Sequence, residues 1–224
     1  MNSVLLVLFL TFFMANATFA EMDLEKQLTG KSFQKAELVP VGYVASAETK
    51  GDLNGDGTDE VALIIRENST SKEGDEFRQQ YLLIFKGVTP AKYVIWKIGR
   101  HHFVETNAGF MEPNGVGTFE IKKGVLTIET SLALSSGGWG AGGCTMKWRE
   151  EKNGFRLIGL TVVDFSRSCA CGTTVDTNFL TGSKIITSDR SSSGEQLPTE
   201  RVKKVKEKSK TVFWEQFDYT KFCN

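Results

Sequence analysis

The feature that most limits the fold of this chain is a succession of short apolar or alternating segments separated by glycine-containing turns. Two hairpins are clear: residues 118–129 alternate on either side of a Lys-Gly turn, and residues 146–160 flank Lys152, Asn153 and Gly154. Asn-Gly is a strong hairpin signal because both residues tolerate positive φ. The pattern predicts an all-β fold, an antiparallel meander packed as a sandwich or partial barrel, with one short helix at residues 22–30.

Other segments complete this prediction. Trp148 and Trp214 lie in alternating patterns and are expected in the core, whereas the Ser-, Asp- and Glu-rich stretch 187–200 is expected to be a mobile loop. Residues 201–210 contain six basic side chains. These fit an edge strand protected by lysines better than a patch for an anionic partner or a membrane surface. Further strands are expected at residues 39–47, 61–66, 80–85 and 93–96.

Composition and the N-terminal segment indicate the class of protein. The chain has 224 residues, with 27 basic and 27 acidic side chains. This balance argues against a nucleic-acid partner, which requires a surplus of Lys and Arg. Residues 1–20 form an apolar stretch ending in Thr18, Phe19 and Ala20, which predicts a signal peptide cleaved after Ala20 and no stable membrane insertion afterwards. Residues 21–224 are expected to form a single β-rich domain.

The four cysteines are Cys144, Cys169, Cys171 and Cys223. An even number in an exported chain indicates two disulfides. A bridge between Cys169 and Cys171 would be strained, so we expect one of this pair to meet Cys144 and the other to meet Cys223. A four-thiolate zinc site is the less favoured alternative, because zinc sites use Cys-x2-4-Cys spacing.

An acidic stretch at residues 52–60 carries oxygen donors at alternate positions. Calcium takes six to eight oxygen ligands, and a tight loop with donors at every second residue can direct them inward. Gly55 and Gly57 permit the positive φ angles that such a loop requires. The sequence therefore predicts a Ca²⁺ site with a structural role, the alternative being an Asx-rich turn without metal. Its donors are the side chains of Asp52, Asn54, Asp56 and Glu60 and the carbonyl of Thr58.

The loop differs from an EF-hand, because the twelfth position counted from Asp52 is the apolar Leu63. It resembles instead the calcium loops of FG-GAP or VCBS repeats, found in integrin-type propellers and in exported bacterial proteins. The resemblance implies side-chain ligands at the first, third, fifth and ninth positions, with Glu60 where the family usually has Asp. The neighbouring Asp59 could substitute for Glu60. The family normally occurs in tandem, whereas this chain has one copy.

No common catalytic motif is present in the sequence. His101 and His102 are adjacent and would point to opposite faces of a strand, so they cannot act as a pair. Trp139 lies in a segment with five glycines in ten residues, and it is either an exposed anchor for a glycan or protein partner or a side chain folded onto the core. We therefore expect a periplasmic or secreted, calcium-stabilised, non-catalytic binding protein, such as an inhibitor or immunity-type partner of an exported enzyme. The alternative is a secreted hydrolase acting on cell-wall or polysaccharide substrates through dispersed carboxylates.

Overall fold

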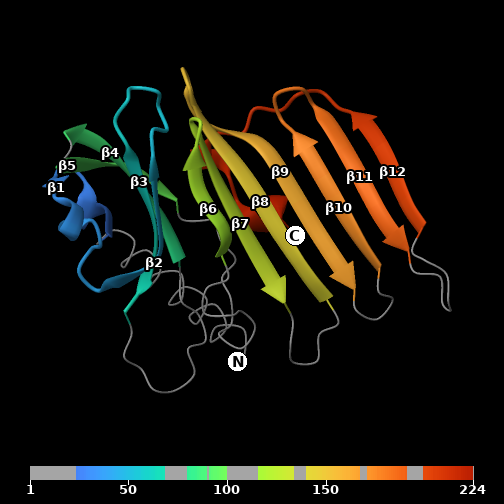
Figure 1. Cartoon of the computed structure of the whole chain (residues 1–224), viewed down its shortest axis with the longest axis horizontal. Coiled ribbons are helices and arrows are strands. Elements are labelled where there is room, and N and C mark those ends of the chain that lie inside the picture. The colour runs from blue at the N-terminus through green and yellow to red at the C-terminus, as the bar shows by residue number, and fades with distance from the viewer. Residues whose placement is uncertain are drawn as a thin grey trace, which may run out of the picture.

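The computed structural model describes residues 24–68, 80–89, 91–99, 116–133, 140–166, 171–190 and 199–223. Nearly all of the regular structure is antiparallel β-sheet, in two sheets (Figure 1). This confirms the predicted all-β class. The predicted signal peptide at residues 1–20 lies outside the described residues, as do His101, His102, Trp139 and Cys169.

The first sheet has five strands in the order β1-β5-β4-β3-β2. A helix at residues 24–28 and the 3-10 helix η1 (Lys35–Glu37) precede β2 in the chain, and the first of them lies within the helix expected at residues 22–30. Its strands are β1 (Ser32–Phe33), β2 (Tyr43–Gly51), β3 (Glu60–Glu67), β4 (Gln80–Thr89) and β5 (Lys92–Gly99).

The second sheet is a meander whose seven strands are neighbours in sequence order, from β6 to β12. Both predicted hairpins are confirmed: Lys123 and Gly124 turn between β6 and β7 with positive φ, and β8 pairs with β9 across the turn before Gly154. Its strands are β6 (Val116–Lys122), β7 (Val125–Ala133), β8 (Gly140–Glu151), β9 (Gly154–Ser166), β10 (Cys171–Asn178), β11 (Ser183–Arg190) and β12 (Thr199–Lys206).

Two predicted boundaries are wrong. The strand expected from Val39 begins only at Tyr43, because a turn closed by the Tyr43 N–H on the Pro40 carbonyl precedes it. The loop expected at residues 187–200 is largely strand at its two ends, since β11 continues to Arg190 and β12 begins at Thr199. Thr187, Ser188, Asp189 and Glu200 are polar strand residues that are half-buried or exposed, so polarity alone did not distinguish strand from loop.

Two hydrophobic clusters fill the molecule. One lies on the face of the first sheet where Leu24, Leu28 and Leu38 cover β3 and β4. The other joins both sheets and contains Trp148 and Trp214, which confirms the expectation that these tryptophans are core residues. Because both faces of the first sheet are covered, residues 61–65 are all buried and the sequence there is continuously apolar.

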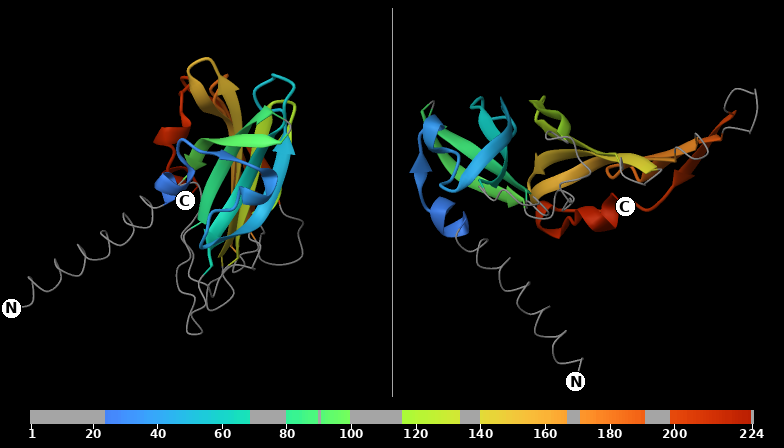
Figure 2. Two further views of the ribbon diagram at one scale, coloured as in Figure 1. Left: turned by 90° about the vertical axis from the view of Figure 1, so that its left-hand side faces the viewer. Right: turned by 90° about the horizontal axis from the view of Figure 1, so that it is seen from below.

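The C-terminal segment packs on the face of the second sheet that belongs to the shared core, here called the inner face (Figure 2). After β12 the chain crosses back to β9, where Phe213 bridges Arg156, and continues into η2 (Trp214–Gln216) and α2 (Tyr219–Phe222). Residues 207–213, which make this crossing, are called the strap. Within the described residues no helix has the length and apolarity needed to cross a membrane.

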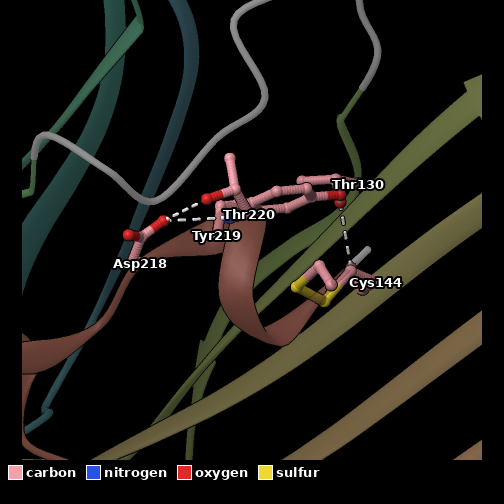
Figure 3. The surroundings of a disulfide bond; sticks show 6 residues. Thr130, Cys144, Asp218, Tyr219 and Thr220 are labelled. Atoms are coloured by element: carbon pink, nitrogen blue, oxygen red, sulfur yellow. Dashed lines mark hydrogen bonds between the residues drawn. A yellow bond between two sulfur atoms is a disulfide. The ribbon is translucent and has the colours of Figure 1, made fainter.

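A disulfide links Cys144 on β8 to Cys223 after α2, with the two Cα atoms 5.7 Å apart (Figure 3). The predicted pairing of each of these cysteines with Cys169 or Cys171 is therefore wrong. The register explains why: Cys171 pairs with Ser166, which pairs with Gly140, four residues from Cys144 on β8. At about 3.4 Å per residue along a strand and 4.8 Å between neighbouring strands, the Cα atom of Cys171 is farther from that of Cys144 than the ~4.4–6.8 Å that a disulfide spans. Cys171 is itself disulfide-bonded.

Candidate metal centre

The acidic loop at residues 52–60 connects β2 to β3, at the top of Figure 1. Glu60 is the first residue of β3, so the loop enters a strand directly, as the sequence predicts. Gly55 and Gly57 have φ of +79° and +82°. Because few L side chains tolerate this region, these glycines fulfil the predicted role of turning the chain around the centre of the loop.

Three of the five predicted ligands come together in the loop. The Asn54 amide nitrogen donates to Asp56 Oδ2 at 3.0 Å and to Glu60 Oε1 at 2.9 Å. The second Glu60 oxygen accepts the Leu53 N–H at 2.8 Å. Two carboxylates therefore converge on a single amide group.

The other two predicted ligands take part in hydrogen bonds within the loop, Asp52 through its carboxylate and Thr58 through its N–H, whereas the predicted ligand atom of Thr58 is its carbonyl oxygen. The two carboxylate oxygens of Asp52 accept the N–H groups of Gly55 and Gly57, at 2.7 and 2.9 Å. The Thr58 N–H donates to Asp56 Oδ1 at 2.8 Å. Asp59, considered from sequence as a substitute for Glu60, lies 3.7 Å from Lys50 and its side chain is about half exposed. The hydrogen bond to Asn54 is made by Glu60, so the ninth position of the loop contributes Glu60 to this cluster.

Burial gives Glu60 unusual electrostatics. Its exposed fraction is 0%. Loss of hydration raises the pKa of the Glu60 carboxyl above its ordinary value, and the negative charge of Asp56 raises it further. In contrast, the hydrogen bond from the Thr58 N–H lowers the pKa of Asp56. Bringing a cation close to both groups would relieve the repulsion between them.

Two residues that the sequence did not identify complete the surroundings of the loop. Lys86 on β4 places its Nζ 3.5 Å from Asp56 Oδ2 and 5.9 Å from the centre of the Trp96 ring. Gly87 allows the loop to lie against β4, because a Cβ there would be 2.7 Å from Thr58 Cγ2. Neither could be found from sequence, since the long connection between β3 and β4 leaves their register open.

The loop is also tied to both sheets. Leu53 is 2% exposed and belongs to the core shared by the two sheets. Its carbonyl lies beside Gly124 in the β6–β7 turn, where a Cβ would be 3.7 Å away. Nearby, the Ile121 N–H donates to Thr49 Oγ1 at 3.3 Å across the junction. A ligand bound in the loop would therefore stiffen the place where the sheets meet.

The donor chemistry fits a hard cation, because the carboxylate oxygens of Asp56 and Glu60 and the amide oxygen of Asn54 are ligand types that calcium takes. The Asn54 oxygen accepts the Asp56 N–H at 2.8 Å in this structure, so it would have to leave that hydrogen bond to become a ligand. Within the described ranges, no group of three or more His, Cys, Asp or Glu side chains is arranged to hold a metal ion. The cluster has two acidic members, with the amide as its third. Comparisons with family models, curated proteins and solved structures found no match to this chain.

Proposed function

We propose that residues 52–60 bind Ca²⁺ and that the ion braces the junction of the two sheets in an exported binding protein. The observation that carries the proposal is the fully buried Glu60 carboxylate, which shares the Asn54 amide with Asp56. Two carboxylates held this close are costly without a cation. Asp52 supports the loop shape through Gly55 and Gly57, and the resemblance to FG-GAP or VCBS loops gives it a place among the ligands as well.

Calcium titration of the purified protein tests this proposal. We expect saturable binding by calorimetry and a higher Tm in millimolar CaCl₂ than in chelator, since a ligand at a hundred times its Kd stabilises the folded state by about 2.7 kcal/mol. Glu60→Gln and Asp56→Asn should abolish both effects. Asp59→Asn is the matched control, because Asp59 faces Lys50, and it should retain them. A wild-type Tm and calorimetric trace unaffected by calcium would refute the site.

Replacing Lys86 tests the calcium site with a change that should strengthen binding instead of abolishing it. Its ammonium group lies beside Asp56, where it partly supplies the positive charge that an ion would bring. We expect Lys86→Met to bind calcium several-fold more tightly than the wild type, because the competing charge is gone. Weaker binding by this variant would contradict the account of Lys86 as a competing charge.

We infer that the wider function is recognition without catalysis, with a protein or glycan partner outside the cytoplasm. The disulfide between Cys144 and Cys223 supports an oxidising compartment. Perturbed carboxyl groups on the second sheet and C-terminal segment have structural partners: hydrogen bonds lower the pKa of Glu151 beside Arg149 and of Asp218 beside Thr220. A general acid in a hydrolase requires a raised pKa instead, and the described carboxyl group with that property, Glu60, is fully buried in the acidic loop, away from any substrate.

Two measurements on the calcium-loaded, oxidised protein test this wider function. Affinity capture from native envelope extract should recover a stoichiometric partner, such as an enzyme that the protein inhibits. Incubation with a panel of polysaccharides and peptidoglycan should give no turnover. Turnover that is lost on changing an acidic side chain would favour the hydrolase instead.

A further inference from the structure

We propose that the inner face of the second sheet carries a binding pocket for a small amphipathic anion, far along the sheet from the acidic loop. The pocket has a volume of about 260 Å³ and lies beneath the strap and α2. This is slightly below the usual range for small-molecule sites, which starts at about 300 Å³, so the ligand has to be small. It does not depend on the metal site, because its walls come from β9 to β11 and the C-terminal segment.

The floor of the pocket is apolar and built by the sheet register. Val162 on β9 pairs with Val175 on β10, and Leu160 pairs with Thr177, so their side chains form adjoining rows on the inner face. Phe179 and Phe222 close the floor, with their ring centres 6.5 Å apart. A purely ionic ligand such as inorganic phosphate would leave this surface unused, so the ligand needs an apolar body.

The walls of the pocket are basic and come from three separate elements. Lys184 is on β11, Lys208 and Lys210 are on the strap, and Lys221 is on α2. Glu207 also lines the pocket, so the lining has a surplus of positive charge beside an apolar floor, which favours an anionic head group over a neutral or cationic one. The pocket therefore selects a ligand with one apolar end and one negative end.

The charges in the pocket are only partly neutralised. Lys184 Nζ lies 3.8 Å from Glu207 Oε1, and Lys221 Nζ lies 3.0 Å from Asp218 Oδ2. Lys208 and Lys210 have no ion pair among the residues that the structure describes. The positive charges of Lys208 and Lys210 therefore remain for a ligand. The backbone of the strap is fixed by a hydrogen bond from the Glu207 N–H to the Gly182 carbonyl, at 2.8 Å.

The pocket is a shaped site because the strap is held at several points. Ser209 Oγ donates to the Phe179 carbonyl, and the Leu157 N–H donates to the Val212 carbonyl at 2.9 Å. Gly182 permits the close approach, because a Cβ there would lie 2.1 Å from the Glu207 carbonyl oxygen. A preformed pocket of this kind lowers the entropic cost of binding.

Calorimetric titration with octanoate at low ionic strength tests the proposal. We expect one site per chain, with octan-1-ol and octylammonium binding at least ten-fold more weakly. Octyl phosphate as a further ligand distinguishes a requirement for a carboxylate from acceptance of any anionic head group. Failure of octanoate to bind at millimolar concentration, or binding no tighter than that of octan-1-ol, would overturn the proposal.

Matched variants locate the site. Lys208→Gln with Lys210→Gln should weaken octanoate binding at least ten-fold, and the exposure of both side chains makes the variant safe for folding. The control pair, Lys203→Gln with Lys206→Gln on β12, removes the same charge outside the pocket and should bind like the wild type. Val175→Phe should block binding by filling the floor, with circular dichroism to confirm folding. Equal losses in the two lysine pairs would overturn the assignment.

Discussion

Glu60 is both a buried residue at the start of a strand and a proposed ligand of the calcium ion. It opens β3, is fully buried and still carries a carboxyl group that contacts Leu53 and Asn54. Buried acidic groups are rare unless paired, so the position has to offset its desolvation through hydrogen bonds or a cation. This is why a residue predicted from donor spacing alone is also the one most dependent on what binds beside it.

Gly87 offers a test of how the loop is seated. In Gly87→Ala the new Cβ would lie 2.7 Å from Thr58 Cγ2 and 3.0 Å from the Asp59 carbonyl oxygen. We expect a loss of about 1–3 kcal/mol in the free energy of unfolding from this overpacking, together with weaker calcium binding. Chemical denaturation measures the first and calorimetry the second.

Gly159→Ala is the matched strand-glycine control for Gly87→Ala. Its added Cβ would meet the Lys147 side chain at 3.6 Å, an ordinary contact. Adding Thr58→Ser to Gly87→Ala removes the clashing methyl group and should recover part of the lost stability. A Gly87→Ala protein as stable as wild type would show that the loop is not held against β4.

Asp218 gives a pH-dependent prediction. The hydrogen bond from the Thr220 hydroxyl and the nearby Lys221 hold its pKa at about 2, below the ordinary value of 3.8 (Figure 3). A lowered pKa stabilises the folded state above pH 3.8, and this contribution is lost as pH falls through about 2. Asp218→Asn mimics the protonated side chain, so its Tm deficit relative to wild type should be present at neutral pH and vanish near pH 2. A deficit that is constant with pH would contradict this account.

The candidate site shows what donor spacing can and cannot reveal. Alternate oxygen donors and two glycines identified the loop, its positive φ angles and its direct entry into a strand. They did not show that Asp52 would turn toward Gly55 and Gly57, because a carboxylate can satisfy either a cation or the loop's own N–H groups. Lys86 comes from a different strand, whose register depends on tertiary pairing.

At the scale of elements, the two sheets differ in how far their strands are covered by other parts of the molecule. β3 and β4 are covered on both faces and read as continuous apolar runs, which made them easy to predict. β12 is an edge strand of the described sheet, and its Arg and Lys side chains disfavour further strand addition, as expected for residues 201–206. The same expectation is wrong for Lys208 and Lys210, which lie on the strap because β12 ends at Lys206. The cysteine pairing could not be predicted, since it depends on how far apart β8 and β10 place their residues along the sheet.

The Cys144–Cys223 disulfide fastens α2 to β8, beside the buried hydrogen bond between Thr130 and Tyr219 (Figure 3). Removing it with Cys144→Ala and Cys223→Ala should lower the free energy of unfolding by about 2–5 kcal/mol and make α2 the first site of limited proteolysis. The double variant is preferable to a reducing agent, which would also act on the disulfide of Cys171. Unchanged stability and protease resistance would contradict this role.

At the scale of the whole molecule, one hydrophobic core is shared by the two sheets, and we expect them to unfold as one cooperative unit. Trp148 contacts Phe155, Trp214 and Phe217, and Trp96 of the first sheet reaches Phe155 with ring centres 5.7 Å apart. Leu53 extends this core into the acidic loop. Sequence patterning predicted the two tryptophans as core residues, but not that one cluster would span both sheets, because alternation shows which face is buried and not what covers it.

Leu53→Ala tests this cooperativity. We expect a loss of about 2–5 kcal/mol in the free energy of unfolding, as for other buried leucines. Far-ultraviolet circular dichroism and tryptophan fluorescence should report the same denaturation midpoint, because both sheets lose the same support. Val41→Ala, at a position 88% exposed, should have no effect. Two separate midpoints would show that the sheets unfold independently.

The separation of 79 residues between Cys144 and Cys223 has a consequence for how the chain matures. A polypeptide is made from its N-terminal end, so β8 emerges well before its covalent partner exists. During that interval the Cys144 thiol has no Cys223 to pair with, and the C-terminal segment does not yet cover the aromatic residues around Trp148. The timing of oxidation relative to synthesis therefore determines whether this cysteine meets Cys223 or is captured earlier by another thiol.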